Sequence, residues 1–391
     1  MKKQPIFTII IALSLVLVTT AVVFYGRGYR FDFGQGKPDF FGTGLLVATS
    51  SPNGAQVFVN DHLTTATDNT LNLTPGDYTI RIFKEGYFPW EKKLKVKKEV
   101  VAKADALLFP TAPKLESITN LGVRNPVLDP SKSRLAFAVA SQSARKNGIY
   151  ILDLTTRPIL TLQSSSTQIA DDTVDRFSSS NFIFSPNGSQ LIATTSAKTS
   201  YLLDAGSFNS NPQDTTATLS NVNSEWQKQK ADKEKARLDS LPKKLRQIVL
   251  DNFNIIEWSL DDNRILYEAS SSANLPIIID PRLVGVDATA EQRKLEKGTA
   301  YVYDIKEDKN YKLDVKSQKN LHWFPDSNHL ISVADQRIDI MEYDGTNKTT
   351  VYAGPFVDGF VFPWPDGSKI IILTNLGNPD IAPNLYTIVL K

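Results

Sequence analysis

The chain has 391 residues, of which 41% are apolar and 22% charged, so it has the composition of globular protein and the length for two or three folded units. The 44 basic and 42 acidic side chains leave a net charge of +2. This balance argues against a nucleic-acid partner, which requires a clustered basic surface. The chain has no cysteine, which excludes disulfides and thiolate sites. Its three histidines lack metal-ligand spacing, and we predict neither a metal site nor a cofactor.

Residues 6–25 form an apolar segment that contains no charged side chain. A helix of about 20 residues crosses the roughly 30 Å hydrocarbon core of a bilayer. The apolar part of a cleaved signal peptide is shorter, about 7–15 residues. We therefore predict an uncleaved, single-pass transmembrane helix, preceded by a short cytoplasmic tail at residues 1–5.

The charges that flank this segment give a weak orientation signal. Lys2 and Lys3 precede it and Arg27 and Arg30 follow it, so the positive-inside count nearly cancels. The very short leading segment favours an N-terminus inside the cell, with the bulk of the chain outside the cytoplasm. Glycine, proline and scattered aromatic residues in 26–43 predict a linker or juxtamembrane stalk.

Short strands separated by turn residues indicate a small β-sandwich over residues 44–110. Residues 56–60 and 78–82 alternate polar with apolar side chains, as half-buried strands do. Asn53-Gly54 follows the strand-like run 45–49 and predicts a tight hairpin there. Trp90–Val96 is expected to form a further strand.

This region resembles a PEGA domain. The resemblance is carried by Pro52-Asn53-Gly54-Ala55 in place of the Pro-Glu-Gly-Ala motif, by the strand 57–61, by Leu73–Tyr78 and by Lys84-Glu85-Gly86-Tyr87. PEGA domains occur in surface and envelope proteins of bacteria and archaea, as interaction or spacer modules without known catalytic residues. The resemblance therefore implies an envelope protein.

Aromatic side chains cluster after this motif, at Tyr87, Phe88 and Trp90. Aromatic faces bind the apolar faces of sugars, so a cell-wall glycan is one candidate ligand. Packing into the sandwich core is the interpretation that we favour, because clustered aromatics in small β-domains usually point inward.

Five turns rich in proline, aspartate, asparagine and glycine recur after residue 125, each followed by an apolar run. They begin the segments 129–137, 185–193, 259–267, 324–332 and 364–372. A second set of strand-like runs lies later in each unit, at 148–153, 200–204, 300–304, 338–343 and 385–389. This repeated plan is typical of the blades of a β-propeller.

The repeat resembles Tol-type and WD-like propellers, in which a Ser-Pro-Asp-Gly turn joins the first two strands of each blade. Here the turn reads Ser185-Pro186-Asn187-Gly188 and Trp364-Pro365-Asp366-Gly367 in the second and fifth copies. The resemblance implies a propeller over residues 111–391 with five blades, six being the alternative. We expect residues 117–121 to form an outer strand that completes the last blade and closes the ring.

Two insertions interrupt the repeat. Residues 222–252 are charged and helix-prone, and they end in an apolar stripe at helical spacing. A docking helix for a partner or for anionic lipid, with Trp226 as a contact, is one interpretation. Packing of the stripe on the propeller rim is the one that we favour. Residues 273–297 read as a long surface loop, a type that is often functional.

The chain carries none of the common catalytic motifs. It lacks a G-x-S-x-G elbow, a P-loop, G-x-G-x-x-G, H-E-x-x-H and an EF-hand loop. We expect no peptidase domain after the last blade, which ends at Lys391. Acid pairs such as 171–172 lie in turn-like segments, where they are usually solvated. We therefore predict a protein without catalytic residues.

These features predict an all-β protein with one transmembrane helix, a PEGA-like sandwich and a propeller. Its expected function is a membrane-anchored extracytoplasmic scaffold that presents the propeller to an envelope protein. One alternative is a protein that binds carbohydrate or peptidoglycan through an exposed aromatic row. Another is a propeller enzyme acting on envelope polymers, with three or more acids converging at the central channel.

Overall fold

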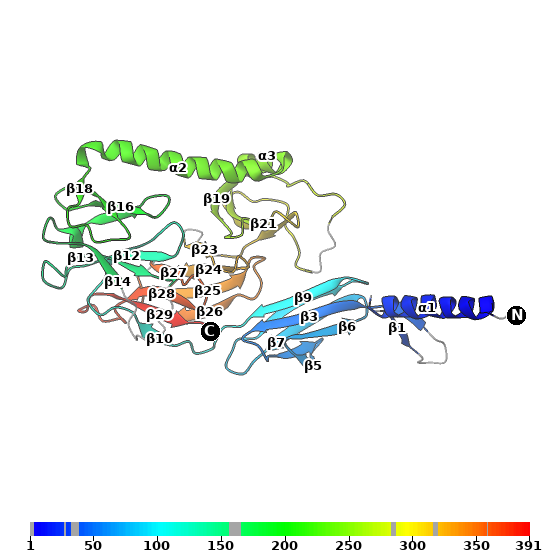
Figure 1. Ribbon diagram of the computed structural model, residues 1–391. Helices are drawn as coiled ribbons and strands as arrows, with labels where there is room; N and C mark the ends of the chain where they lie inside the picture. Colours follow the sequence, from blue (N-terminus) through cyan, green and yellow to red (C-terminus); the bar gives the residue numbers. More distant parts are fainter. Residues whose placement is uncertain are drawn as a thin grey trace. The chain divides into compact units, whose positions relative to one another are not determined.

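The computed structural model describes residues 4–26, 29–32, 39–155, 166–282, 287–315, 320–357 and 359–391 (Figure 1). The chain divides into two compact units. The first comprises Met1–Thr111 together with Pro281–Ala290, and the second comprises Ala112–Asp280 and Glu291–Lys391.

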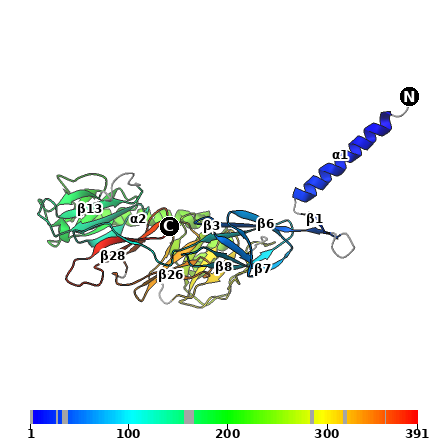
Figure 2. The same cartoon turned by 90° about the horizontal axis from the view of Figure 1, so that it is seen from below.

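The first unit begins with the apolar helix α1 (Gln4–Gly26; Figure 2), whose Phe24 packs against Tyr29 just after the helix. Its segment Phe7–Gly26 is long and apolar enough to cross a membrane, and none of it is buried within the protein. The hydroxyl of Thr19 donates to the carbonyl of Leu15 at 2.7 Å, so this polar group is satisfied inside the helix. Such a helix is either a membrane anchor or a signal sequence.

The segment predicted as a linker, residues 26–43, contains a short hairpin. Strand β1 (Tyr29–Asp32) pairs antiparallel with β2 (Asp39–Gly42), with Tyr29 opposite Gly42. Aromatic residues favour strands, and both strands contain them. The glycines and the proline in the sequence between the two strands favoured the prediction of a linker over that of a strand pair.

Seven strands then form two facing sheets. One sheet has the order β6 (Asn69–Leu73), β3 (Gly44–Ser51), β9 (Val101–Leu107). The other has the order β5 (His62–Ala66), β4 (Gln56–Val59), β7 (Gly76–Phe83), β8 (Trp90–Val96). Alternate side chains of both sheets form one core, as expected for a sandwich.

The predicted hairpin at Asn53-Gly54 is wrong. Gly54 has the expected positive φ of +72°, but β3 and β4 belong to different sheets, so this turn carries the chain across the sandwich. A turn motif specifies local backbone conformation and not the pairing partner. The sequence also hid β9, because the buried residues of that strand are the small Ala102, Ala104 and Ala106.

The second unit contains five four-stranded sheets, each a blade. Their strands, in order within each blade, are β11 (Arg124–Leu128), β12 (Arg134–Val139), β13 (Gly148–Asp153) and β14 (Ser166–Asp171); β15 (Asn181–Phe184), β16 (Gln190–Thr194), β17 (Ser200–Asp204) and β18 (Gln213–Asp214); β19 (Phe253–Trp258), β20 (Arg264–Ala269), β21 (Ala300–Asp304) and β22 (Lys309–Lys312); β23 (Leu321–Trp323), β24 (His329–Ala334), β25 (Arg337–Glu342) and β26 (Thr349–Ala353); and β27 (Val361–Pro363), β28 (Lys369–Thr374), β29 (Asn384–Val389) and β10 (Leu115–Ser117). Two short 3-10 helices, η2 (Phe177–Ser179) and η3 (Thr216–Thr218), join strands of this unit.

The first strand of each blade is the innermost one. β11 contacts β15 and β19 contacts β23, which places these strands where neighbouring blades converge. The middle strands read as unbroken apolar runs because both faces of a blade pack against its neighbours. Ile370, Ile371 and Ile372 of β28 show this, since all three are fully buried.

The ring is closed by a strand from the beginning of the unit. β10 pairs antiparallel with β29, with Leu115 opposite Ile388. The side-chain oxygen of Asn384 then accepts the Gly122 N–H at 2.9 Å. The predicted closing strand is thus present, but it covers 115–117 and not 117–121.

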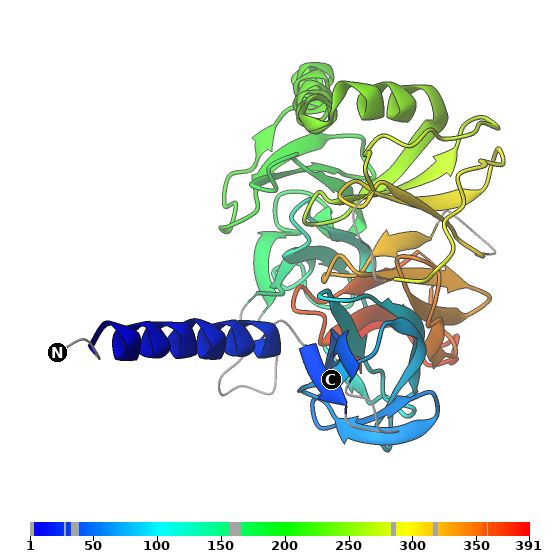
Figure 3. The same cartoon turned by 90° about the vertical axis from the view of Figure 1, so that its right-hand side faces the viewer.

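The insertion 222–252 forms two helices, α2 (Leu219–Ser240) and α3 (Lys243–Asn252), which lie together at one rim (Figure 3). Leu245 and Val249 of α3 pack into the core of the third blade. The Trp258 indole N–H of that blade donates to Glu234 of α2 at 3.0 Å. The apolar stripe therefore packs on the propeller itself.

The second insertion, 273–297, is anchored to the third blade. The carboxylate of Asp308 accepts the backbone N–H groups of Ile278 and Ile279 at 2.6 and 3.0 Å. The insertion is therefore more ordered near the blade than the predicted surface loop implied. Its residues 281–290 belong to the first unit, where the carboxylate of Asp287 lies 3.1 Å from the ammonium of Lys92.

Candidate interaction face

The five repeated turns share one hydrogen-bond plan, and each joins the innermost strand of its blade to the second strand. In every turn the N–H of the fourth residue donates to the carbonyl of the first, at 2.8–3.1 Å. The N–H of the first residue donates to the carbonyl of the sixth. We call these segments, 129–134, 185–190, 259–264, 324–329 and 364–369, the turn face. Equivalent connections of a propeller lie on one face of the ring.

The fourth residue of every turn has a left-handed backbone. Its φ is 59° at Lys132, 74° at Gly188, 54° at Asp262, 60° at Ser327 and 67° at Gly367. Glycine adopts this conformation freely, whereas other residues pay about 1–2 kcal/mol for it. Only two turns use glycine, so the other three turns carry this strain.

We expect Gly188→Ala to lower the free energy of unfolding of the propeller by about 1–2 kcal/mol. The added Cβ would keep the unfavourable φ and would meet the Asp129 carboxylate and the Arg134 guanidinium at 3.1 and 3.2 Å. Urea unfolding of the full chain measures the loss. Gly298→Ala, which shares the positive φ but has open space around its Cβ, isolates the backbone contribution. Equal losses for the two variants would show that the contacts at Gly188 do not matter.

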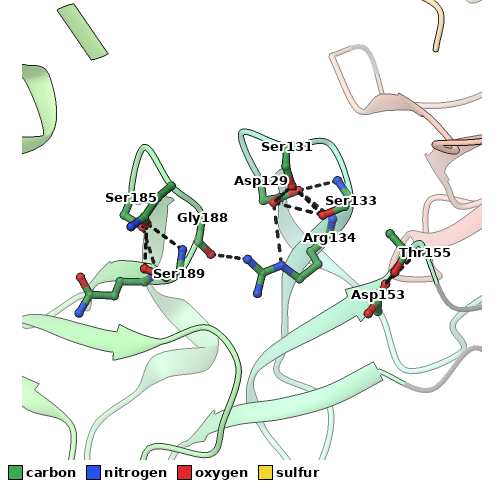
Figure 4. A network of polar contacts seen from close by, with 11 residues as sticks. Asp129, Ser131, Ser133, Arg134, Asp153, Thr155, Ser185, Gly188 and Ser189 are labelled. Atoms are coloured by element: carbon green, nitrogen blue, oxygen red, sulfur yellow. Dashed lines mark hydrogen bonds and ion pairs between the residues drawn. The ribbon is translucent and has the colours of Figure 1, made fainter. Parts of the chain in front are cut away.

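Asp129 organises the first turn from inside it (Figure 4). Its carboxylate accepts the backbone N–H groups of Ser133 and Arg134 at 2.7 and 2.8 Å, and the hydroxyl of Ser131 at 2.5 Å. The Arg134 guanidinium then donates to the Gly188 carbonyl at 2.5 Å. This bond joins the first blade to the second.

Arg264 occupies the same turn position in the third blade and makes more contacts. Its Nε donates to Asp304 Oδ2 at 2.8 Å, and its Nη1 donates to the Ser327 carbonyl at 2.9 Å. Its guanidinium also lies 3.9 Å from the ring centroid of Tyr343. Arg264 thus joins the third blade to the fourth.

An ion pair crosses the centre of the ring. Lys132 in the first turn pairs with Glu257 on β19 of the third blade. In a ring of five, the first and third blades are not neighbours, so this pair must span the region around the axis. On the fourth blade, the backbone N–H of Trp323 donates to Glu257 at 3.0 Å, and the His322 ring nitrogen lies 3.6 Å from the same carboxylate. We call Lys132, Glu257 and His322 the axial cluster.

The environment of Glu257 stabilises its charged form. Burial raises the pKa of this carboxyl, but the nearby His322 ring, the Lys132 charge and the Trp323 N–H together lower it below its ordinary value of 4.5. A group whose pKa is depressed on folding stabilises the fold above its unfolded pKa. That contribution is lost as the pH falls through the folded pKa.

We therefore expect Glu257→Gln to destabilise the propeller by about 1 kcal/mol at neutral pH. The deficit should shrink as the pH falls below 4.5, because the native carboxyl then becomes neutral as well. Urea unfolding across this pH range measures it. Glu225→Gln, at an exposed position on α2, is the control. A deficit that persists unchanged into acid would contradict the assigned role of the charge.

The turn face also exposes one large apolar side chain. The second residue of four turns is proline, and in the third turn it is Leu260, which is 51% exposed. A half-exposed leucine near charged groups is suited to contact with another protein. The turn face therefore carries the Lys132 ammonium and an exposed leucine, and the His322 ring lies two residues before its fourth turn.

The residues singled out in the sequence lie elsewhere. Trp90 is only 4% exposed and belongs to the sandwich core, so its ring cannot serve as a platform for a ligand. Tyr87 packs against the same core and bridges Pro110. The half-buried Phe88 donates its backbone N–H to Phe109. Trp90 thus lies in the core, whereas Tyr87 and Phe88 remain partly exposed.

Trp226 is buried on α2, at 7% exposure, and is not available as an exposed contact. Within the described ranges, no group of three or more histidine, aspartate or glutamate side chains could hold a metal ion. Trp226 belongs to the second unit, and the three aromatic residues of the sandwich belong to the first.

The axial cluster could not be found from a motif. Lys132 and Glu257 are 125 positions apart, and nothing in the sequence pairs them. One signal was available: Lys132 stands where two of the other four turns have glycine. A long charged side chain at a position that favours glycine is unusual, and it indicates that the charge has a binding partner.

Comparison with known proteins identifies the sandwich. Residues 43–111 match the PEGA domain family. They form a PEGA domain. The match covers all seven sandwich strands, from β3 to β9. No curated protein matches the chain.

Many solved structures are similar to this chain, and three of them serve as examples. TolB from Acinetobacter baumannii is 13% identical with a TM-score of 0.24, and the match covers 80% of this chain and 60% of that one. A candidate TolB from Agrobacterium tumefaciens is 13% identical with a TM-score of 0.22, covering 72% and 92%. An acylaminoacyl peptidase from Pyrococcus horikoshii is 13% identical with a TM-score of 0.20, covering 69% and 38%. The propeller assignment rests on the five four-stranded blades of the second unit.

Proposed function

We propose that this protein is a membrane-anchored, extracytoplasmic binding and scaffold protein. Helix α1 holds it in the membrane uncleaved with its N-terminus inside, the PEGA domain spaces it from the bilayer, and the propeller presents the turn face to an envelope protein. One observation carries this proposal. An apolar helix that the protein does not bury precedes a PEGA domain and a closed ring of five blades.

The turn face is the binding surface in this proposal. The axial cluster supplies charges next to it, and Leu260 in the third turn supplies an exposed apolar contact. Protein partners favour such a mixture, with an apolar contact framed by polar groups. No glycan site is proposed, because Trp90 is buried in the core. A catalytic function is not proposed either, since no observation favours one.

Two matched leucines test the surface. Leu260 and Leu376 are 51% and 53% exposed. Leu376 lies between the second and third strands of its blade, and successive antiparallel connections alternate between the two ends of a sheet. It therefore lies on the face opposite the turn face. Replacing either leucine with serine should leave the stability within about 0.5 kcal/mol of wild type.

We would crosslink the full chain in isolated envelopes and identify the recovered proteins by mass spectrometry. The proposal predicts a specific envelope partner whose recovery falls at least about tenfold with Leu260→Ser, as for a central contact worth more than 1 kcal/mol. Recovery should be unchanged with Leu376→Ser. Loss with both variants, or with neither, would contradict the turn face as the binding surface. Retention of a glycan instead, with turnover of that polymer, would contradict the scaffold function.

A further inference from the structure

Aromatic contacts join the last turn of α1 to the β8–β9 turn of the PEGA domain. The ring of Phe24 packs edge-to-face on that of Tyr29, with centroids 5.0 Å apart. The Tyr29 hydroxyl donates to Glu99 Oε1 at 2.6 Å, and Lys98 Nζ lies 4.7 Å from the centroid of the same ring. These contacts place the β8–β9 turn at the end of the apolar helix.

The other strand of the hairpin supports the same placement. β2 ends at Gly42, where a Cβ would collide with the aliphatic part of the Lys98 side chain. The next carbonyl, that of Thr43, accepts the Glu99 N–H at 3.1 Å. Both strands of the hairpin therefore contact the β8–β9 turn, so its position at the helix end does not depend on one contact.

This part of the PEGA domain is rich in lysine, with Lys92, Lys93, Lys95, Lys97 and Lys98 in or just after β8. β8 is the last strand of its sheet, and residues 287–288 cover its outer edge, where Leu94 bridges Asp287 and the Lys93 carbonyl accepts the Ala288 N–H at 3.3 Å. Lys92 pairs there with the carboxylate of Asp287. Lys97 and Lys98 follow the last residue of β8, beyond this covered edge, and Lys98 is exposed.

We propose that Lys97 and Lys98 contact the anionic phospholipid headgroups of the leaflet in which α1 ends. This inference rests on the proposed membrane anchor. An apolar helix that ends at Gly26 places Tyr29 in the interfacial layer, where amphipathic aromatic rings settle. The ammonium group over that ring then lies within a Debye length, about 8 Å, of the headgroup charges. Lysine side chains also extend readily toward headgroups from such positions.

The test uses the full chain in nanodiscs of phosphatidylcholine, with or without phosphatidylglycerol. Amide hydrogen exchange of residues 95–100 is measured in both. With the anionic lipid, exchange at the β8–β9 turn should slow by at least about fivefold, the effect of one lysine at an anionic surface. High salt should remove the difference, because it screens surface charges.

Charge reversal separates this contact from a general effect of charge. Lys97→Glu and Lys98→Glu should each remove most of the lipid dependence. Lys103→Glu makes the same change at an exposed position on β9 and should retain it. Lys98→Glu removes both a positive charge and the contact with Tyr29. Lys97→Glu reverses a neighbouring charge without touching that contact, so loss of the lipid dependence in this variant assigns the effect to charge.

Two outcomes would overturn the inference, and they differ. If the chain stays in the nanodiscs and exchange is the same in both lipids, the lysine contact is wrong while the anchor stands. If the chain does not remain with the nanodiscs, the anchor is wrong and this inference fails with it.

Discussion

Replacing Arg264 with alanine is expected to lower the free energy of unfolding of the propeller by about 3 kcal/mol. The Asp304 side chain, 4% exposed, would lose its guanidinium partner and retain an uncompensated buried charge. The junction between the third and fourth blades would also lose the bond to the Ser327 carbonyl. The midpoint of thermal unfolding should fall by roughly 6–12 °C for a unit of this size.

Arg134→Ala provides the matched comparison, because Arg134 holds the same turn position in the first blade. Its nearest carboxylate, that of Asp129, is 3.9 Å away and already accepts two backbone N–H groups. We expect a loss of only about 1 kcal/mol, the value of one hydrogen bond. Similar losses for the two arginines would show that the buried Asp304 charge is not what makes Arg264 important.

A disulfide between β10 and β29 should stabilise the ring strongly. Glu116 and Thr387 lie directly opposite each other in this antiparallel pair, where Cα atoms are about 4.5–5.5 Å apart and a disulfide can form. Oxidation of Glu116→Cys/Thr387→Cys would close most of the propeller into one covalent loop. In the chain-entropy account, this raises the free energy of unfolding by up to about 5 kcal/mol.

The bond is detected by faster migration of the oxidised chain on a denaturing gel, and the gain by thermal unfolding with and without reductant. The chain has no native cysteine, so no other pair can form. Glu116→Cys/Tyr386→Cys is the control, because residue 386 is paired with Ser117 and points to the other face of the sheet. Failure of the first pair to crosslink would show that β10 does not close the ring.

The repeated turns made most of the propeller predictable. A tight turn rich in proline, aspartate and asparagine, followed by an apolar run, is a local pattern, and local physics determines it. The closing strand was harder to place. Its pairing with β29 depends on residues more than 260 positions away, such as Asn384, which accepts the Gly122 N–H. Sequence reasoning found the strand but displaced it by two residues.

Features that depend on tertiary contacts could not be predicted. The Asn53-Gly54 turn has the expected backbone, but only the packing of two sheets decides that it joins one to the other. The axial cluster also depends on tertiary structure, because Lys132 contacts Glu257 only when the five blades close around an axis. For the aromatic residues after the PEGA motif, the sequence allowed two interpretations. Their residue types fitted both a ligand site and a core, and only burial distinguishes these for Trp90.

The central claim is that one uncleaved helix holds the PEGA domain and the propeller outside the cytoplasmic membrane. The absence of cysteine allows a direct test with single-cysteine variants and a membrane-impermeant maleimide. Ala197→Cys, at an exposed position in the propeller, should be labelled in right-side-out membrane vesicles, whereas Lys2→Cys should be labelled only after permeabilisation. The labelled chain should have its full mass and sediment with the membranes. Labelling of Lys2→Cys alone, or a shortened chain in the soluble fraction, would contradict this topology and the anchor.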